Sequence, residues 1–356
     1  MTLSTIQWPP SSKACAPGLA CAFLLAVACL SGAAADEPKV ALLVGAESNP
    51  YFKKMADAAK AEAAKDDVDL AITSKVGDSD EVQSNAVETA VASGVSTILI
   101  VPTGRGVVPA IRKARAAGIM VLALDNPTTP NDAVDMAYIT SNRDAGQALG
   151  KYVATKLAGA PAVIAMLDAF GGKVVQVDID RDHGFLTGMG IPEINPNVNG
   201  AEPKTGKYTG GGTYTVVCHQ ATQAAEDGGR TAMENCLSKN PDINVVYTIN
   251  EPAAFGAYKA LQAAGKTQGV TIATFDGSCR GMAALKKGVI SVDVQTYPAK
   301  MAELGIQAAV AYAKNKSIPK PSPGMNYFNS GIALVTDSPV SGINSIGSDE
   351  GRKSCF

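Results

Sequence analysis

The sequence predicts an α/β protein with two Rossmann-like lobes, each a parallel sheet flanked by helices. The 356 residues are enough for two domains. From Pro38 on, short apolar runs rich in strand-forming residues alternate with longer stretches of Ala, Lys and Glu that have helical spacing. Several short runs are almost entirely apolar, as in STILIV and IMVLAL. Such runs are typical of strands covered by helices on both faces, as in a parallel sheet.

The first series of strands and helices predicts one lobe, which is complete near Thr140. The expected strands are residues 40–44, 69–73, 97–101 and 120–124. The expected helices are residues 50–65, 80–93 and 107–117. Because a helix lies between each pair of successive strands, the strands are expected to run parallel.

A second series of the same kind predicts the second lobe. Its expected strands are residues 162–167, 214–219, 245–249, 271–275 and 291–295. Its expected helices are residues 143–157, 181–189, 222–240, 253–264 and 281–287. Residues 191–213 interrupt the pattern with Pro, Asn and Gly, so we expect a long surface loop or a short hairpin there. A helix at 298–314 and a strand near 332–335 follow. The helix belongs to neither series, which indicates that the chain crosses between the lobes more than once.

Residues 1–35 are expected to be a secretory signal peptide. Lys13 precedes an apolar run over residues 19–30, and Ala33-Ala34-Ala35 offers a cleavage site after Ala35. The apolar run is too short for a membrane span, which needs about 20 residues. Acylation at Cys29, as in a lipoprotein, is the alternative. We therefore expect an exported, periplasmic protein.

The cysteines that follow the expected cleavage site predict two disulfides. They are Cys218, Cys236, Cys279 and Cys355, an even number in an oxidising compartment. The sequence leaves three connectivities open. We favour Cys218 with Cys236, which closes a short loop, and Cys279 with Cys355, which would tie the end of the chain to the body.

Neither the charge nor the motifs of the chain point to nucleic-acid binding or catalysis. The formal net charge is −2, so bulk charge selects no polyanionic partner. The sequence has no GxxxxGK[ST] loop, no GxGxxG after the first expected strand and no GxSxG elbow. Its two histidines, His183 and His219, lack metal-ligand spacing, so we expect ordinary surface or loop residues, no metal and no cofactor. A secreted carbohydrate-active enzyme with Asp125 and Asp276 as acid and base is the enzymatic alternative.

Polar and aromatic residues recur at the carboxyl ends of the expected strands in both lobes, where open α/β sheets bind ligands. Asn49 also fits a helix cap, but capping does not explain the two aromatic residues that follow it. Flat rings suit the apolar faces of a sugar, and carboxylate, amide and guanidinium groups suit its hydroxyls. We therefore predict a monosaccharide site. Its candidate residues are Asn49, Tyr51, Phe52, Arg105, Asp125, Asn126, Asp178, Arg181, Asn250, Asp276 and Gln295.

The same positions carry a resemblance to a known family. The segments are, in chain order, Asn49-Pro50-Tyr51-Phe52, Leu124-Asp125-Asn126, Arg181-Asp182-His183-Gly184-Phe185, Asn250, Phe275-Asp276-Gly277 and Gln295. The chain resembles the periplasmic sugar-binding proteins of ABC importers, in the branch of ribose- and fructose-binding proteins. In that family the first segment bonds a hydroxyl and sandwiches the sugar between rings. Asn126 stands where the family usually has Arg. The 191–213 insertion and the four cysteines are more like the fructose-binding branch, so fructose is favoured over ribose or another monosaccharide.

The resemblance also implies an architecture and partners. The fold would be the type 1 periplasmic binding protein fold, with three crossovers near Thr140, residues 295–296 and residues 327–328. The N-terminal lobe would be residues 36–140 plus 296–327, and the C-terminal lobe residues 141–295 plus 328–356. A non-enzymatic, monomeric binding protein would close around one sugar and dock on a membrane permease, and a chemoreceptor is a further candidate partner. A periplasmic sensor that presents a sugar-like signal to a membrane receptor is the main alternative. A regulator of the Lac-repressor type shares the fold, but the sequence lacks an N-terminal helix-turn-helix.

Overall fold

The computed structural model describes residues 37–47, 49–74, 79–171 and 175–356. The expected signal peptide, residues 1–35, lies outside these ranges. From Glu37 on, the chain forms one compact unit. Within the described ranges, no helix is both long enough and apolar enough to cross a membrane.

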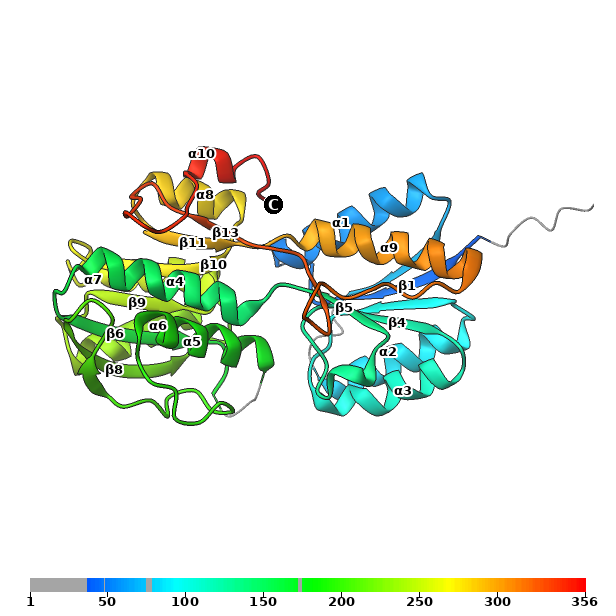
Figure 1. The fold of residues 1–356 in the computed structure, drawn as a ribbon, viewed down its shortest axis with the longest axis horizontal. Coiled ribbons are helices and arrows are strands. Elements are labelled where there is room, and N and C mark those ends of the chain that lie inside the picture. Colours follow the sequence, from blue (N-terminus) through cyan, green and yellow to red (C-terminus); the bar gives the residue numbers. More distant parts are fainter. Residues whose placement is uncertain (1–36, 48, 75–78, 172–174) are drawn as a thin grey trace, which may run out of the picture. The chain divides into compact units, whose positions relative to one another are not determined.

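The first lobe is built on a six-stranded sheet in which every strand pair is parallel (Figure 1). The strand order is β12-β5-β4-β3-β1-β2. The strands are β1 (Lys39–Leu43), β2 (Asp69–Thr73), β3 (Thr97–Ile100), β4 (Met120–Asp125), β5 (Met136–Ile139) and β12 (Phe328–Asn329).

Helices cover both faces of this sheet, as the continuous apolar runs predicted. In β1, Val40 and Leu42 pack against one helical layer, whereas Ala41 and Leu43 pack against the other. The first layer is α1 (Pro50–Lys65) with α9 (Pro298–Asn315), and the second is α2 (Asp80–Ala92) with α3 (Val108–Ala116). Burial of alternate residues on both faces explains why these strands show no polar alternation.

The sheet is wider than the four strands that the sequence predicts. β12 was missed because its 2 residues carry little periodic signal. β5 was also missed, although it has 4 residues, as the predicted strand β3 does. β12 pairs with Tyr138 and Ile139 of β5. The third passage between the sheets therefore follows Asn329, whereas the sequence expectation places it near residues 327–328.

The second lobe is built on a seven-stranded sheet of order β13-β11-β10-β9-β6-β8-β7. Its five inner strands are parallel and its two edge strands are antiparallel to their neighbours. The strands are β6 (Ala162–Asp168), β7 (Thr205–Lys207), β8 (Thr213–Ala221), β9 (Val245–Thr248), β10 (Thr271–Asp276), β11 (Val292–Gln295) and β13 (Ala333–Val335). The short antiparallel pair β7–β8 confirms a hairpin in the 191–213 insertion.

Two helical layers also enclose this sheet. One layer is α4 (Asn142–Leu157) with α5 (Gln176–Met189), and the other is α6 (Glu226–Lys239), α7 (Glu251–Ala263) and α8 (Cys279–Lys286), followed later in the chain by α10 (Ser348–Gly351). α5 begins five residues earlier than predicted, at Gln176 rather than Arg181. α6 begins later than residue 222 because Gln223 and Ala224 have positive φ angles of 55° and 53°, which are incompatible with a helix.

The chain passes between the two sheets three times, after β5, after β11 and after β12. The first and third passages are bonded to each other, since the Ser330 amide donates to Ile139 O at 2.8 Å and the Ser330 and Thr140 hydroxyls lie 3.2 Å apart. At the second passage the Thr296 amide donates to Asp276 O at 2.9 Å. These three segments of chain connect the two lobes.

Both favoured disulfides are confirmed. Cys218 of β8 is bonded to Cys236 of α6, which ties a strand to the helix that covers it. Cys279, the first residue of α8, is bonded to Cys355. The second bond closes a sequence separation of 76 residues, against 18 for the first.

Candidate functional site

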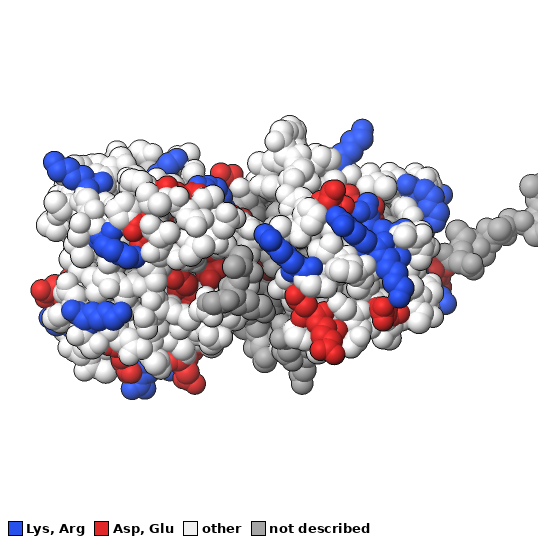
Figure 2. Space-filling model, turned by 90° about the horizontal axis from the view of Figure 1, so that it is seen from below, with Lys and Arg blue, Asp and Glu red and all other residues white. Residues whose placement is uncertain are grey.

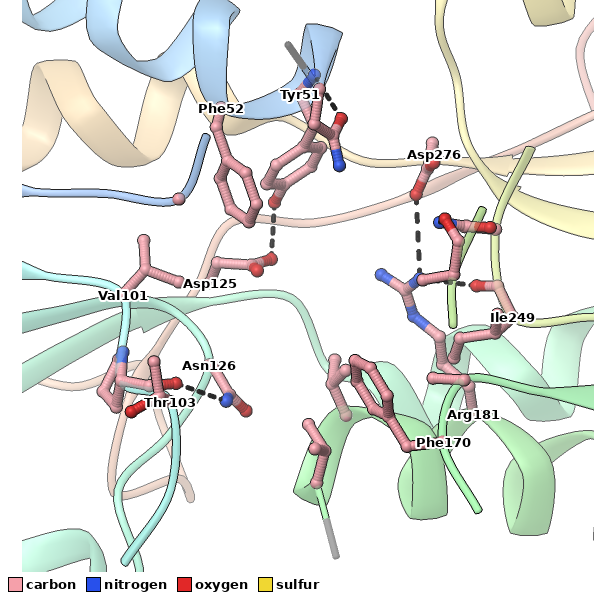
Figure 3. Close-up of a pocket in the computed structure, with 18 residues that line it drawn as sticks. Tyr51, Phe52, Val101, Thr103, Asp125, Asn126, Phe170, Arg181, Ile249 and Asp276 are labelled. Atoms are coloured by element: carbon pink, nitrogen blue, oxygen red, sulfur yellow. Dashed lines mark hydrogen bonds and ion pairs between the residues drawn. The ribbon is translucent and has the colours of Figure 1, made fainter. Parts of the chain in front are cut away.

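One pocket of about 250 Å³ is lined by the carboxyl ends of strands from both sheets (Figure 3). It brings together most of the residues that the sequence singled out. The predicted residues that line it are Asn49, Tyr51, Phe52, Asp125, Asn126, Arg181, Asn250 and Asp276. The strand-end reasoning therefore located one continuous cavity from widely separated parts of the chain.

The aromatic wall of the pocket is the first turn of α1. This turn is fixed by Asn49, whose side chain caps the helix by accepting from the Tyr51 amide at 3.0 Å, and by Pro50. The Tyr51 and Phe52 rings meet edge to face, with centroids 5.5 Å apart. Gly45 makes room for this arrangement, because a Cβ atom there would lie 2.4 Å from the Phe52 ring. Asn49 thus caps helix α1, which is the structural alternative to its predicted contact with a sugar.

Asp125 connects the aromatic wall to the end of β4. The Tyr51 hydroxyl donates a hydrogen bond of 2.6 Å to the Asp125 carboxylate (Figure 3). Burial raises the pKa of the Tyr51 hydroxyl, and the charge of Asp125 adds to the increase. Burial also raises the pKa of Asp125, whereas the hydrogen bond from Tyr51 acts in the opposite direction. The pair places a carboxylate directly beside an aromatic face.

Asn126, which follows Asp125, uses the NH₂ group of its side-chain amide for a hydrogen bond within the protein. Its Nδ2 donates to Pro102 O at 2.7 Å, and this bond fixes the side chain. Its Oδ1 is buried and accepts no hydrogen bond from the described residues. A buried acceptor without a donor is unfavourable, so this oxygen is suited to a ligand hydroxyl.

Arg181 and Asp276 form the opposite, polar wall. Arg181 Nε donates to Asn142 Oδ1 and its Nη1 to Ile249 O, both at 2.9 Å. The same Nη1 lies 3.7 Å from the Asp276 carboxylate, and the guanidinium covers the Phe275 ring at 4.7 Å. Burial raises the pKa of Asp276, and the charge of Arg181 opposes this increase. Figure 3 shows the guanidinium held in place from the side of the second lobe.

Asp125 and Asp276 occupy equivalent places, since each is the last residue of a central parallel strand. Both have positive φ angles, 65° for Asp125 and 138° for Asp276. Such conformations are unfavourable for side chains with a Cβ atom and cost of order 1–3 kcal/mol when they persist. Strain at two matching carboxylates that face one pocket is typical of residues held for binding.

Asn250 also lines the pocket, and both ends of its amide are hydrogen-bonded to the protein. Its Oδ1 caps α7 by accepting from the Ala253 amide at 3.1 Å, and its Nδ2 donates to Ala224 O at 3.0 Å.

Three of the predicted residues do not line the pocket. Arg105 is exposed, in a short 3-10 turn that leads away from the end of β3. Asp178 lies beneath the pocket and accepts from the Ala169 and Phe170 amides; burial and the charge of Asp168 raise its pKa to about 7. Gln295 is buried and donates to Gly277 O and Gly351 O. Asp178 and Gln295 therefore hold backbone segments next to the pocket in place: Asp178 bonds to Ala169 and Phe170, and Gln295 bonds to Gly277, which follows Asp276.

Two features of the site were missed. Phe170 lines the pocket from the second lobe, and the strand-end rule would have included it had β6 been extended to Asp168. Phe356 packs its ring against Tyr51, with centroids 5.6 Å apart, while its carbonyl accepts from the Cys279 amide at 2.8 Å. No local pattern connects residue 356 with residue 51.

The expectation of two surface or loop histidines is wrong. His183 is 3% exposed within α5, and His219 lies in β8 with its ring between the carboxylates of Asp168 and Glu202. Both were misplaced because the 191–213 insertion packs on them: Val198 O lies 3.2 Å from a ring nitrogen of His183, and Glu202 bonds to His219. Spacing along the chain does not reveal these contacts.

The face of the molecule drawn in Figure 2 carries basic and acidic side chains on both lobes. The two signs are interspersed there, in keeping with the net charge of −2. This face therefore has no extended field of one sign.

Two α/β lobes that contribute strand ends to one shared pocket define a ligand-binding protein of the two-lobe type. The chain belongs to the family described as periplasmic binding protein domain, which it matches over residues 40–317. The fold is accordingly the type 1 periplasmic binding protein fold, and the family consists of substrate-binding proteins rather than enzymes.

Similar proteins include binding components of sugar importers. The ribose import binding protein RbsB of Salmonella typhimurium is 27% identical over 293 residues, which are 82% of this chain and 90% of that protein. The D-apiose import binding protein of Paraburkholderia graminis is 28% identical over 296 residues, 82% of this chain and 86% of that protein. A solute-binding protein of Actinobacillus succinogenes, solved with bound D-allose, has a TM-score of 0.70 at 23% identity and covers 84% of this chain and 98% of its own.

Proposed function

We propose that the protein is the extracytoplasmic monosaccharide-binding component of an ABC importer. The observation that carries the proposal is the pocket itself, in which the strained carboxylates of Asp125 and Asp276 and the guanidinium of Arg181 face the rings of Tyr51 and Phe52. This combination provides apolar faces for a sugar ring and charged partners for its hydroxyls. The relatives named for ribose and apiose import support the same class of ligand.

The size of the pocket favours one sugar ring. A cavity of about 250 Å³ is below the range of about 300–1,000 Å³ found for drug-sized ligands. Fructose is our first candidate because of the resemblance to fructose-binding proteins, and ribose, allose and apiose are the next. Selection among these sugars depends on hydroxyl geometry at Asp125, Asn126 and Asp276.

Transport would use the three connecting segments between the lobes as a hinge. A sugar that bonds to residues of both lobes favours the conformation in which both lobes reach it, so binding shifts the population toward a closed form. A membrane permease, and in some settings a chemoreceptor, would distinguish this form from the ligand-free one. We further propose that the protein acts as a monomer in the periplasm after loss of residues 1–35, which the mass of the exported protein and its elution in size-exclusion chromatography would test.

The test is a thermal-shift screen of the mature protein with D-fructose, D-ribose, D-allose and D-apiose. A ligand that binds only the folded state stabilises it by about 2.7 kcal/mol at 100 times its Kd, so the correct sugar raises the melting temperature. The Asp276→Ala variant should lose the shift. Asp242→Ala is the matched control, since that side chain is 81% exposed on the same lobe, and it should keep the shift.

Absence of a shift with every monosaccharide would contradict the proposal.

A further inference from the structure

A second cluster of polar side chains lies next to the pocket, inside the second lobe. It consists of Asp168 at the end of β6, Asp182 in α5 and His219 in β8, and we call it the Asp-Asp-His cluster. Each residue offers one ligand atom, and these atoms all lie within 4.8 Å of one another. Two carboxylates and an imidazole from three elements thus converge on one point.

The cluster contains a carboxylate that the described protein does not satisfy. Asp182 has no exposed surface, and neither of its carboxylate oxygens accepts a hydrogen bond from the described residues. Oδ1 of Asp168 and the hydroxyl of Tyr247 are also buried without a partner there. One ring nitrogen of His183 and one of His219 each lie 3.8 Å from a carboxylate oxygen of Asp182. A buried carboxylate is strongly unfavourable unless it is protonated or a cation compensates its charge. Burial and the charge of Asp168 raise the pKa of Asp182, so a proton shared with Asp168 is the alternative to a cation.

We propose that Asp168, Asp182 and His219 bind one divalent transition-metal cation of the Zn²⁺ type. A mixed set of imidazole nitrogen and carboxylate oxygen suits Zn²⁺, and Mn²⁺ less strongly, whereas Ca²⁺ prefers a site made of oxygen alone. The cation would take the place of the proton between His219 Nδ1 and the Asp168 carboxylate, which are 2.8 Å apart. That proton leaves to solvent, so His219 binds the metal as the neutral ring.

Residues around the cluster already have the arrangement of an outer shell. Metal-bound histidines nearly always donate their second ring N–H to a carboxylate or carbonyl. Here His219 Nε2 lies 3.0 Å from the carboxylate of Glu202, which is itself held by Lys204 at 2.7 Å. Glu202 belongs to the 191–213 insertion, so in this proposal the insertion orients the imidazole of His219.

A cation also has a route to the cluster. A cavity of about 280 Å³ is lined by Asp168 and His219 together with Asn197 and Asn199 of the insertion. It leaves room for water molecules that complete the coordination of a three-ligand site.

The metal would stiffen the part of the second lobe that forms the proposed sugar site. Asp168 directly precedes Ala169 and Phe170, and Asp182 directly follows Arg181, all of which line the pocket. Cross-linking Asp168 and Asp182 through a cation would fix the spacing of these pocket residues. This consequence rests on the proposed function, whereas metal binding itself does not.

The test is calorimetric titration of chelator-treated, untagged mature protein with ZnCl₂, MnCl₂ and CaCl₂. We expect saturable binding of one Zn²⁺ or Mn²⁺ per chain and a higher melting temperature of the metal-bound form. Asp182→Asn should weaken binding at least 100-fold. Glu202→Gln should weaken it about 10–100-fold, as expected for an outer-shell partner. Asp242→Asn, an exposed carboxylate of the same lobe, is the control and should bind as the wild type does.

Several outcomes would overturn the proposal. These are no saturable binding of Zn²⁺ or Mn²⁺, binding that persists in Asp182→Asn, or binding of Ca²⁺ alone. The cluster would then be an ion-pair network in which protonated His219 joins Asp168 and Glu202. Should Asp182→Asn fail to fold, titration of the wild type with Co²⁺ decides, because Co²⁺ in a four-coordinate protein site absorbs visible light much more strongly than hydrated Co²⁺, and these bands should saturate at one equivalent. Failure of the sugar screen would not affect any of these readouts.

Discussion

Replacing Asp276 by alanine and by glycine separates what its carboxylate contributes to binding from what its backbone conformation costs. Both substitutions remove the carboxylate from the pocket. They differ in the Cβ atom, which matters because φ at this position is 138°, in a region that glycine adopts far more readily than alanine. The two variants therefore share a binding defect and differ in stability.

The loss of binding can be estimated from the bonds that a carboxylate makes to hydroxyl groups. Hydrogen bonds to charged groups contribute about 1.5–3 kcal/mol each. A carboxylate that accepts from two hydroxyls thus accounts for about 3–6 kcal/mol, or about 10²–10⁴ in Kd. Arg181 would also lose its partner at 3.7 Å, which adds to the loss in both variants.

The difference in stability follows from the backbone. Strain at an unfavourable φ costs about 1–3 kcal/mol, and glycine removes it. Glycine also gains entropy in the unfolded chain, which costs about 0.5–1 kcal/mol in return. The net expectation is that Asp276→Gly is more stable than Asp276→Ala by about 1 kcal/mol.

Two measurements test this reasoning. Calorimetric titration gives Kd for the sugar that scores in the thermal-shift screen, and urea unfolding of the ligand-free variants gives the free energies of unfolding. Asp242→Ala controls for loss of a carboxylate elsewhere on the lobe. Wild-type affinity in either folded Asp276 variant would refute the binding role. Equal stability of the alanine and glycine variants would refute the role of backbone strain.

Three further predictions concern stability. Tyr51→Phe removes the 2.6 Å hydrogen bond to Asp125 and should lower the free energy of unfolding by about 1.5–3 kcal/mol in urea, whereas an unchanged value would mean that water replaces the bond. Replacing Cys279 and Cys355 by alanine opens a separation of 76 residues and should cost about 4 kcal/mol by the loop-entropy relation; a loss below about 1 kcal/mol would contradict it. Burial raises the pKa of Asp293, so its contribution to stability is present in acid and is lost as pH rises above the ordinary carboxyl range. Asp293→Asn should therefore gain stability relative to the wild type between pH 5 and pH 8, and a difference that does not change with pH would refute the shift.

The sequence predicted the parts of the fold and site that depend on periodicity. Strands buried on both faces are continuous apolar runs, and their carboxyl ends meet at one edge of each sheet, so Asp125 and Asp276 could be assigned to one site from their positions alone, whereas Arg181 was included at an expected helix start. The rule failed where the chain turns after the strand end, as at Arg105. It also failed where the strand end is covered, as at Gln295.

What the sequence could not predict is made by contacts between distant segments. β12 exists only because two residues of a crossover lie beside β5. The Asp-Asp-His cluster joins residues 168, 182 and 219, whose spacing resembles no ligand motif. Only the packing of the insertion over β8 reveals that His219 is enclosed and bonded on both ring nitrogens.

Because Phe356 packs on Tyr51, the disulfide at Cys355 affects how the two lobes can move relative to each other. Phe356 adjoins a residue that is covalently tied to α8 of the second lobe, yet its ring packs on the aromatic wall that the first lobe contributes to the pocket. A motion that separates the two sheets must break the contact between the Phe356 and Tyr51 rings or move the residues that the Cys279–Cys355 disulfide holds. The Cys279–Cys355 disulfide thus holds Phe356 in place against Tyr51. Reduction of this disulfide would free the last residues and so change how readily the two lobes separate, without changing any residue that lines the pocket.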